Sequence, residues 1–133
     1  MCVCCFIDCR FLDFADRSTL FIIVMLLFSL WCCVSIAGEI VCAGAANSFE
    51  IFVWALQTGR VLETLSGHTG PISSLSFSPL DGQLASCSWD CSVRVWDLFA
   101  RHPSRETFIH TSDVLAVAYR PDGRQLCSAT LDG

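Results

Sequence analysis

Three side chains with the chemistry of a hydrolase active site lie close together in the sequence: His68, Ser86 and Asp90. In a Ser-His-Asp triad the imidazole takes the proton of the hydroxyl, and the carboxylate orients the imidazole. The same three residue types return at His110, Ser128 and Asp132, each 42 residues further along the chain. Because a set that returns with a fixed period belongs to a repeat, we interpret these residues as structural and predict no catalytic residues.

The offset of 42 residues extends beyond these six positions. Val53-Trp54 matches Val95-Trp96, and Phe77-Ser78-Pro79 matches Tyr119-Arg120-Pro121, with no gap needed. A period of about 40–45 residues with Gly-His near one end and Trp-Asp near the other is typical of a four-stranded β-propeller blade. We therefore predict an all-β fold, a partial propeller of about three blades with one complete. A closed propeller needs about 4–8 blades, so the chain is expected to be a fragment.

Short apolar runs separated by turn-forming residues indicate the strands that would position these side chains. Each run has about five residues, the usual length of a strand. We predict strands at Ile40–Ala45, Glu50–Trp54, Val61–Leu65, Ile72–Phe77, Leu84–Ser88, Val93–Trp96, Val114–Tyr119 and Leu126–Ala129. The stretch from Arg101 to Arg105 is polar and is predicted to be a loop.

Four residue types recur at matching positions and have complementary hydrogen-bonding groups. Trp96 offers an indole N–H, Ser86 a hydroxyl, His68 an imidazole and Asp90 a carboxylate. Buried in a blade and fully satisfied, such a network would lock a loop to the sheet and specify one geometry. Only the middle repeat has all four types. The third has His110, Ser128 and Asp132 but lacks the Trp, and the first retains Trp54, with Gly44 and Ser48 at the Ser and Asp positions.

The charge of the chain argues against one class of function. The formal net charge is −5, and the sequence has eight arginines and no lysine. A protein that grips nucleic-acid phosphates directly needs a basic patch, which this sequence does not contain. The sequence also has no glycine-rich phosphate loop and no paired His ligands, so no cofactor is predicted.

Ten cysteines are many for 133 residues, but they are unevenly placed. Six precede residue 38, and the repeats contain only Cys42, Cys87, Cys91 and Cys127. A secreted disulfide framework spreads its cysteines through the domain, so we interpret the repeats as intracellular and reduced. The Cys2-x-x-Cys5 pair with Cys9 lacks a second ligand pair at a zinc spacing, and no metal site is predicted.

Residues 1–37 differ in composition from the rest, and we predict a boundary between this hydrophobic, Cys-rich segment and a repeat domain at 38–133. Leu20–Ala37 is a run of 18 uncharged residues, at the lower limit for crossing a bilayer. Ser35 and Ala37 would also suit a signal-peptidase site, although the preceding residues are not basic. The alternatives to a membrane or signal segment are a buried strand pair that leads into the first blade, or a segment foreign to the fold.

From about Gly38 onward the chain resembles the WD-repeat family. The resemblance rests on Ser48–Trp54, Gln57–Arg60, Leu65–His68, Gly70–Ser73, Leu84–Ser86, Ser88–Asp90, Val93–Asp97, Thr111–Asp113, Leu115–Val117 and Arg120–Gly123. It implies a propeller in which the blade network runs from Trp to Ser to His to Asp. Ser48–Trp54 is the most distinctive segment, because most blades of the family carry Asp-Gly or Asp-Asn in that turn. It narrows the resemblance to a tandem-propeller branch of the family.

That branch is implied to act in ribosome biogenesis, as a nucleolar scaffold without enzymatic activity of its own. The implied partners are proteins of a subcomplex of the small-subunit processome, which binds nascent pre-ribosomal RNA and a box C/D small nucleolar ribonucleoprotein. RNA would be bound indirectly or through the full assembly. The alternatives are another WD-repeat protein–protein adaptor, or a product anchored to a membrane through residues 20–37. Candidate partner contacts are the residues Trp89, Arg101, His102 and Arg105.

Overall fold

The computed structural model of the chain describes residues 32–34, 39–45, 48–99 and 104–133. The regular elements of this part are β1 (Cys32–Val34), β2 (Ile40–Gly44), β3 (Ile51–Ala55), β4 (Val61–Leu65), β5 (Ile72–Phe77), β6 (Gln83–Ser88), β7 (Ser92–Asp97), β8 (Ser104–Ile109), β9 (Val114–Tyr119) and β10 (Leu126–Thr130). The first sheet has the order β1-β2-β3-β4, the second β5-β6-β7-β8, and the third consists of β9 and β10. Every described pair of strands is antiparallel.

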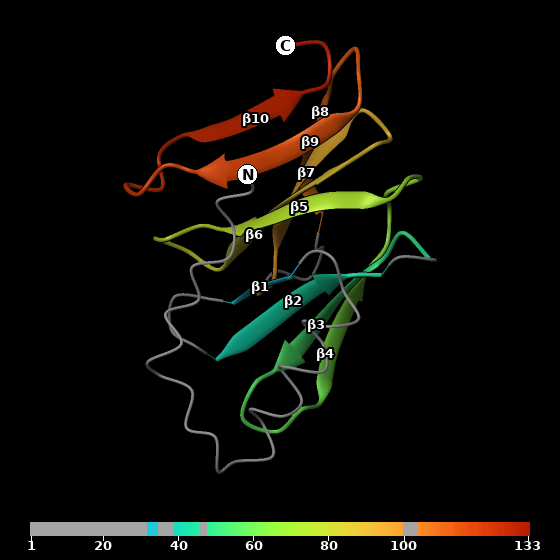
Figure 1. Cartoon of the computed structure of the whole chain (residues 1–133). Coiled ribbons are helices and arrows are strands. Elements are labelled where there is room, and N and C mark those ends of the chain that lie inside the picture. Colours follow the sequence, from blue (N-terminus) through green and yellow to red (C-terminus); the bar gives the residue numbers. More distant parts are fainter. Residues whose placement is uncertain (1–31, 35–38, 46–47, 100–103) are drawn as a thin grey trace.

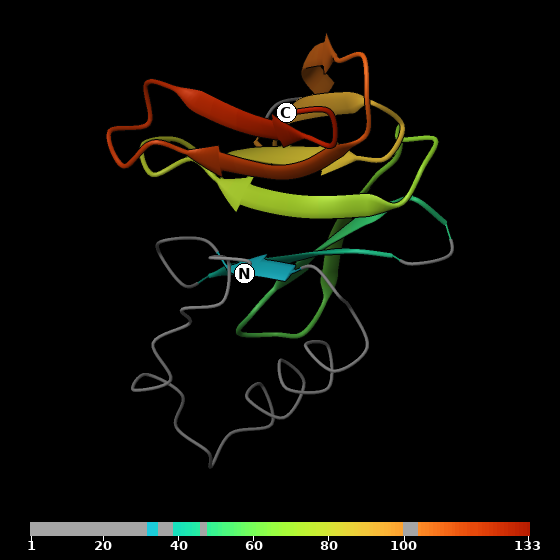
Figure 2. The ribbon, with the colours of Figure 1, turned by 45° about the horizontal axis from the view of Figure 1, so that its top comes forward.

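The three sheets follow one another in chain order, from the first at the bottom of Figure 1 to the third at its top. Their leading strands are neighbours: β9 lies on β5, and β5 lies on β1 (Figure 2). Serine side chains fasten β5 to β9, because the Ser73 hydroxyl donates to the Val114 carbonyl and the Ser76 hydroxyl accepts the Tyr119 amide at 3.1 Å. Successive antiparallel sheets whose leading strands lie side by side are arranged as propeller blades. The prediction of an all-β partial propeller is confirmed.

Strands β5, β6 and β7 of the second sheet have buried side chains on both faces, since successive side chains of a strand point to opposite faces. Leu84 and Trp96 face the first sheet, whereas Ala85, Cys87 and Val93 face the third. The core between the first and second sheets consists of Cys42, Ile51, Val53, Leu65, Ile72, Leu75, Leu84 and Trp96. The core between the second and third sheets consists of Ala85, Cys87, Val93, Val114 and Val117. The second sheet is therefore the only one of the three that has a described neighbour on each side.

The first sheet departs from the repeat period by one residue. Ser86 lies opposite Arg94 in the second sheet, and Ala43 lies opposite Phe52 in the first. Phe52 precedes Arg94 by 42 residues, but Ala43 precedes Ser86 by 43, so the β2–β3 connection is one residue longer than its counterpart. A slip of one residue exchanges the two faces of a strand. The gap-free match is therefore wrong here, and Ala43 rather than Gly44 occupies the position of Ser86.

Strand β1 lies inside the segment that the sequence separates from the repeats. Cys32, Cys33 and Val34 pair with Ala43, Cys42 and Val41, and thereby give the first sheet a fourth strand. This strand fits the alternative in which part of the N-terminal segment leads into the first blade. Residues 1–31 and 35–38 lie outside the described residues, so the boundary at residue 38 stays a prediction. Within the described part of the chain, no helix is long and apolar enough to cross a membrane.

Strand β8 is an element that the sequence analysis did not predict. It begins at Ser104, so Arg105 lies in a strand and not in the predicted polar loop, a part of the prediction that is therefore wrong. Arg101 and His102 fall outside the described residues. The repeat could have predicted β8, because the positions 42 residues after β4 overlap with β8. β8 is the edge strand of its sheet: it pairs only with β7, and its residues 106–109 are exposed. Such a strand can carry polar residues, and these residues obscured the signal.

Candidate functional site

The four predicted network residues of the second sheet form one chain of hydrogen bonds. The Trp96 Nε1–H donates to Ser86 Oγ at 2.8 Å, and Ser86 Oγ lies 2.7 Å from His68 Nε2. His68 Nδ1 in turn lies 2.8 Å from Asp90 Oδ2. Trp96 comes from β7, Ser86 from β6, Asp90 from the turn between them, and His68 from the connection that precedes β5. The chain thereby ties that connection to the two central strands of the sheet.

The direction of each hydrogen bond follows from what each group can donate. An indole nitrogen only donates, and an ionised carboxylate only accepts. Asp90 therefore accepts the proton of His68 Nδ1, which leaves Nε2 as the acceptor of a neutral ring. Ser86 Oγ accepts from Trp96 and donates to that Nε2, so its hydroxyl is used in both senses. Every member is satisfied only while His68 is neutral.

The electrostatics of the site favour this protonation state. Burial lowers the pKa of His68, an effect that the hydrogen bond to Asp90 and its negative charge partly oppose. Burial by itself would raise the pKa of Asp90, but hydrogen bonds from Ser92, the Thr69 amide and His68 outweigh it and lower that pKa to about 2. At neutral pH the site therefore holds a neutral imidazole beside an ionised carboxylate.

These distances also match those of a catalytic triad, so access decides what the site can do. Ser86 is 0% exposed, and the His68 side chain is 1% exposed. The Ser86 oxygen that would attack a substrate already accepts the Trp96 indole, which is itself 1% exposed. Hydrolysis needs a nucleophile that a substrate can reach. The arrangement can hold a loop in place, but it offers no exposed nucleophile.

Two members of the site were missed by the sequence analysis. The Ser92 hydroxyl donates to Asp90 Oδ1 at 2.6 Å, and the Ser92 amide donates to the same oxygen at 3.0 Å. The Thr69 amide donates to Asp90 Oδ2 at 2.9 Å. A Ser two residues after an Asp is a recognisable turn signal, because the Asp side chain can bond its own backbone two residues on. No comparable sequence signal marks a backbone amide such as that of Thr69.

The third sheet contains an open version of the same site. Ser128 Oγ lies 3.3 Å from His110 Nε2, and this pair is exposed. Asp132 accepts the Thr111 hydroxyl at 3.1 Å, and among the described residues no hydrogen bond joins it to His110. Hydrogen bonds from Thr130 and Thr111 lower the pKa of Asp132. The structure therefore brings His110 and Ser128 together but does not close the network.

In the first sheet the serine position of the network is occupied by an alanine. Trp54 is buried, and its ring centroid lies 5.7 Å from that of Phe52. Ala43, at the position of Ser86, has no hydroxyl that could accept the indole. Ser48, predicted at the Asp position, is exposed. Gly44 is needed for close packing instead, since a Cβ on it would lie 2.8 Å from the Cβ of Ile72.

Trp89 is the one candidate partner contact whose side chain the structure describes. It lies in the β6–β7 turn with 55% of its surface exposed. Its amide donates to the Pro71 carbonyl at 3.1 Å, which fixes the backbone that carries the ring. Its role as a partner contact stays a prediction, and so do the roles of Arg101, His102 and Arg105.

The cysteines and acidic residues of the described part show no metal chemistry. No cluster of three or more His, Cys, Asp or Glu side chains in this part could hold a metal ion. Cys42, Cys87, Cys91 and Cys127 are free thiols, and the first two are buried. Burial raises the pKa of Cys42 far above its ordinary value, which disfavours the thiolate, the form of the side chain that acts as a nucleophile.

Comparison with known proteins identifies the repeat and several similar proteins. The sequence profile described as "WD domain, G-beta repeat" matches residues 59–97 and 103–133. The protein named periodic tryptophan protein 2 is 58% identical over 97 residues in Arabidopsis thaliana, covering 73% of this chain and 11% of that protein. Its counterpart in Saccharomyces cerevisiae is 50% identical over 97 residues, covering 73% and 10%. The chain thus spans about a tenth of the curated relatives that it matches.

Solved structures support the same assignment of the fold. The Cps50 (Swd1) β-propeller domain of Myceliophteria thermophila matches 80% of this chain and 34% of that one, with a TM-score of 0.72 and 23% identity. A chain of a mitotic checkpoint complex matches 73% of this chain and 29% of that one, with a TM-score of 0.67 and 26% identity. The repeat profile, the sheets and the blade network agree, and the chain belongs to the WD-repeat family.

Proposed function

We propose that the chain is part of a non-enzymatic WD-repeat scaffold that acts in ribosome biogenesis in the nucleolus. The observation that carries the proposal is the 58% identity over 97 residues with periodic tryptophan protein 2. The scaffold would contribute to small-subunit pre-rRNA processing and to the assembly of a box C/D small nucleolar ribonucleoprotein. Its direct partners would be proteins of a pre-ribosomal complex.

The geometry of the second sheet supports a scaffold rather than a catalyst. The polar groups that could react are buried and bonded to one another, so they stabilise the blade and leave binding to the turns and grooves of its surface. A net charge of −5 disfavours direct contact with phosphates, so RNA would be reached through the assembly. The blade network is thus proposed as the structural support of a binding surface.

An immunoprecipitation experiment tests this function. The full chain would be expressed with an epitope tag in cells and compared with the variant Trp96→Ala, which breaks the blade. We expect pre-rRNA and box C/D small nucleolar RNA to be enriched with the wild-type chain and not with the variant, and the tag to overlap with a nucleolar marker. Background RNA in both samples would overturn the proposal. A tag that resists alkaline carbonate extraction would instead favour the membrane-anchored alternative.

A fluorophosphonate probe separates the structural role of Ser86 from a catalytic one. Such probes label serines that are activated as nucleophiles and reachable from solvent. Because Ser86 is 0% exposed, the native chain should not react at this residue. Labelling of the wild-type chain that disappears in Ser86→Ala, in a variant whose circular dichroism shows it to be folded, would contradict the structural role.

A further inference from the structure

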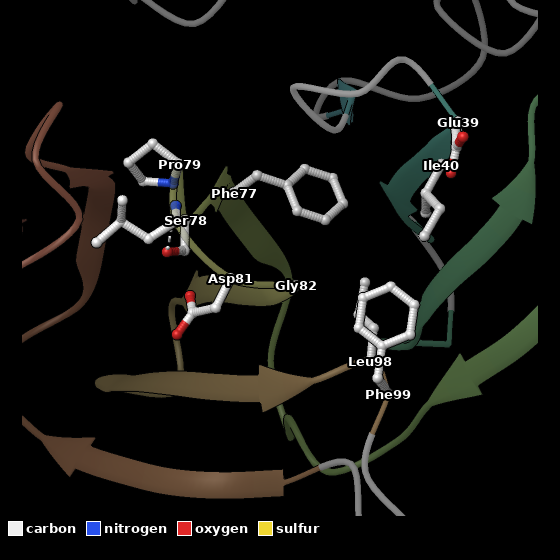
Figure 3. Close-up of a pocket in the computed structure, with 10 residues that line it drawn as sticks. Glu39, Ile40, Phe77, Ser78, Pro79, Asp81, Gly82, Leu98 and Phe99 are labelled. Atoms are coloured by element: carbon white, nitrogen blue, oxygen red, sulfur yellow. Dashed lines mark hydrogen bonds between the residues drawn. The ribbon is translucent and has the colours of Figure 1, made fainter.

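An apolar groove lies between the first and second sheets, at the end of the second sheet opposite the His68–Asp90 network. Its volume is about 350 Å³, within the range of ligand and peptide side-chain pockets. The apolar residues that line it are Ile40, Phe77, Pro79, Leu80, Leu98 and Phe99. In Figure 3 the Phe77 and Phe99 rings and the Ile40 side chain lie around one open space.

Phe99 is the most prominent part of this groove. It is 75% exposed. Its ring lies directly on Gly82, where even a Cβ would come within 2.0 Å of the ring. The Phe99 amide donates to Asp97 Oδ1 at 3.1 Å, so the backbone that presents the ring is held by the end of β7. The Phe99 ring therefore rests on Gly82 and is otherwise largely exposed to solvent.

The charge around the groove is negative. Glu39 lines one side and Asp81 the other, and both are exposed (Figure 3). None of the described residues that line the groove is basic. An exposed aromatic ring at an acidic rim is complementary to a cationic segment that also carries an apolar side chain.

A second groove of the described residues offers a comparison with the first. It lies between the second and third sheets, has the same volume of about 350 Å³, and shares Asp81 with the first groove. There Arg124 stands where the first groove has Gly82, and Tyr119 stands where it has Phe77. The second groove is thus polar and contains a basic residue. Each groove has two carboxylates in its lining, but among the described lining residues only the second groove also has a guanidinium, that of Arg124.

We propose that the first groove binds a segment of a partner protein in which an aliphatic side chain is flanked by arginine or lysine. The aliphatic side chain would fill the space between Phe77 and Phe99, and the basic residues would pair with Asp81 and Glu39. The bulky apolar contact would supply most of the affinity, while the exposed charge pairs would mainly set orientation and association rate.

Fluorescence anisotropy with synthetic peptides and the full chain tests this proposal. The probe is a labelled hexapeptide with two central leucines between pairs of arginines. Matched peptides replace the leucines by serines or the arginines by glutamates. We expect the first peptide to bind and the other two to bind at least about tenfold more weakly, the effect of losing one anchor contact. Phe99→Ser and Asp81→Lys should weaken binding of the first peptide, each by about tenfold or more.

Phe108→Ser is the matched control, because Phe108 lines the second groove and is 47% exposed. This variant should bind the leucine peptide as the wild type does. The proposal fails if the wild type does not bind the leucine peptide, if the serine peptide binds equally well, or if Phe108→Ser weakens binding as much as Phe99→Ser. It also fails if sedimentation velocity shows a dimer that Phe99→Ser dissociates, since a second copy would then occupy the groove. No pre-ribosomal component takes part, so this result is independent of the proposed function.

Discussion

The second and third sheets carry the same His, Ser and Asp residue types in two different states. In the second sheet the His68–Ser86 distance is 2.7 Å, the pair is buried, and Trp96 completes the chain. In the third sheet the His110–Ser128 distance is 3.3 Å, and the pair is exposed. The second sheet is covered on both faces, whereas the third has a described neighbour on one. Among the described residues, the network is thus closed where an indole and a neighbouring sheet bury it.

This difference matters energetically because hydrogen bonds depend on their surroundings. In a low-dielectric interior a satisfied bond is stronger than in water, and an unsatisfied group is costly. The second network should therefore contribute to stability and respond sharply to mutation. The third should tolerate the loss of its members, since water can replace each partner.

The largest expected effect comes from removing the indole. Trp96→Ala should lower the free energy of unfolding by about 3–5 kcal/mol, because it deletes a buried aromatic side chain and leaves Ser86 without its donor. Trp89→Ala, in the exposed turn, should change it by less than about 0.5 kcal/mol. Urea denaturation followed by circular dichroism measures both. Equal losses for the two variants would show that the indole at position 96 has no special role.

The matched serines test burial directly. Ser86→Ala leaves the Trp96 N–H and His68 Nε2 without partners inside the blade and should cost about 1–3 kcal/mol. Ser128→Ala removes an exposed hydroxyl and should cost less than about 0.5 kcal/mol. The same denaturation assay compares them. A cost at Ser128 as large as that at Ser86 would mean that the third network is also closed.

The pH dependence of stability tests the protonation state. Burial lowers the pKa of His68, so between the folded and unfolded values the unfolded chain binds more protons. Stability should therefore fall as the pH drops from 7.5 through about 6.5, the ordinary value of His, and continue to fall toward the lower folded value. Asp90 acts in the same direction, but only as the pH falls below its ordinary value of 3.8 toward about 2.

Urea midpoints at pH 7.5, 6.5 and 5.5 measure this effect, and His68→Gln should flatten the curve. An NMR titration of the His68 ring in the wild type gives an independent result if that variant does not fold. A ring that becomes protonated above the ordinary pKa of His would contradict the assignment of a neutral imidazole.

The smallest expected effect concerns the turn beside Asp90. Three equivalent positions have a positive φ: Phe49 at 57°, Cys91 at 62° and Gly133 at 95°. Side chains other than Gly are strained there by about 1 kcal/mol. Cys91→Gly should therefore be more stable than Cys91→Ala, by about 0.5–1 kcal/mol, because both lose the thiol but only Gly relieves the strain. A Gly variant less stable than the Ala variant would show that the strain is not relieved.

Much of the fold could be predicted from the sequence because the repeat positions are marked by local chemistry. Strands β4, β5 and β9 have the predicted bounds, since turn residues flank apolar runs. The residues of the second network are likewise brought together by the structure, because indole, hydroxyl, imidazole and carboxylate recur at readable positions. The strand bounds depend on signals a few residues apart, whereas the network residues, which span His68 to Trp96, were picked out by the 42-residue repeat.

What could not be predicted depends on contacts between distant parts of the chain. The extra residue between β2 and β3 changes which side chains face the second sheet, and only packing against that sheet selects this register. Ala43 carries no polar signal that would place it opposite Phe52. Strand β1 is three residues long and pairs only through β2, so its sequence alone does not distinguish it from the run that precedes it.

The central claim is that Trp96, Ser86, His68 and Asp90 act as one structural unit. A double-mutant cycle with Trp96→Phe and Ser86→Ala tests it most directly, because Trp96→Phe removes the N–H donor while keeping an aromatic ring. If the unit exists, the two losses of unfolding free energy should differ from additivity by about 1 kcal/mol or more. Losses that add to within about 0.5 kcal/mol would show that the two side chains act independently and would contradict the claim.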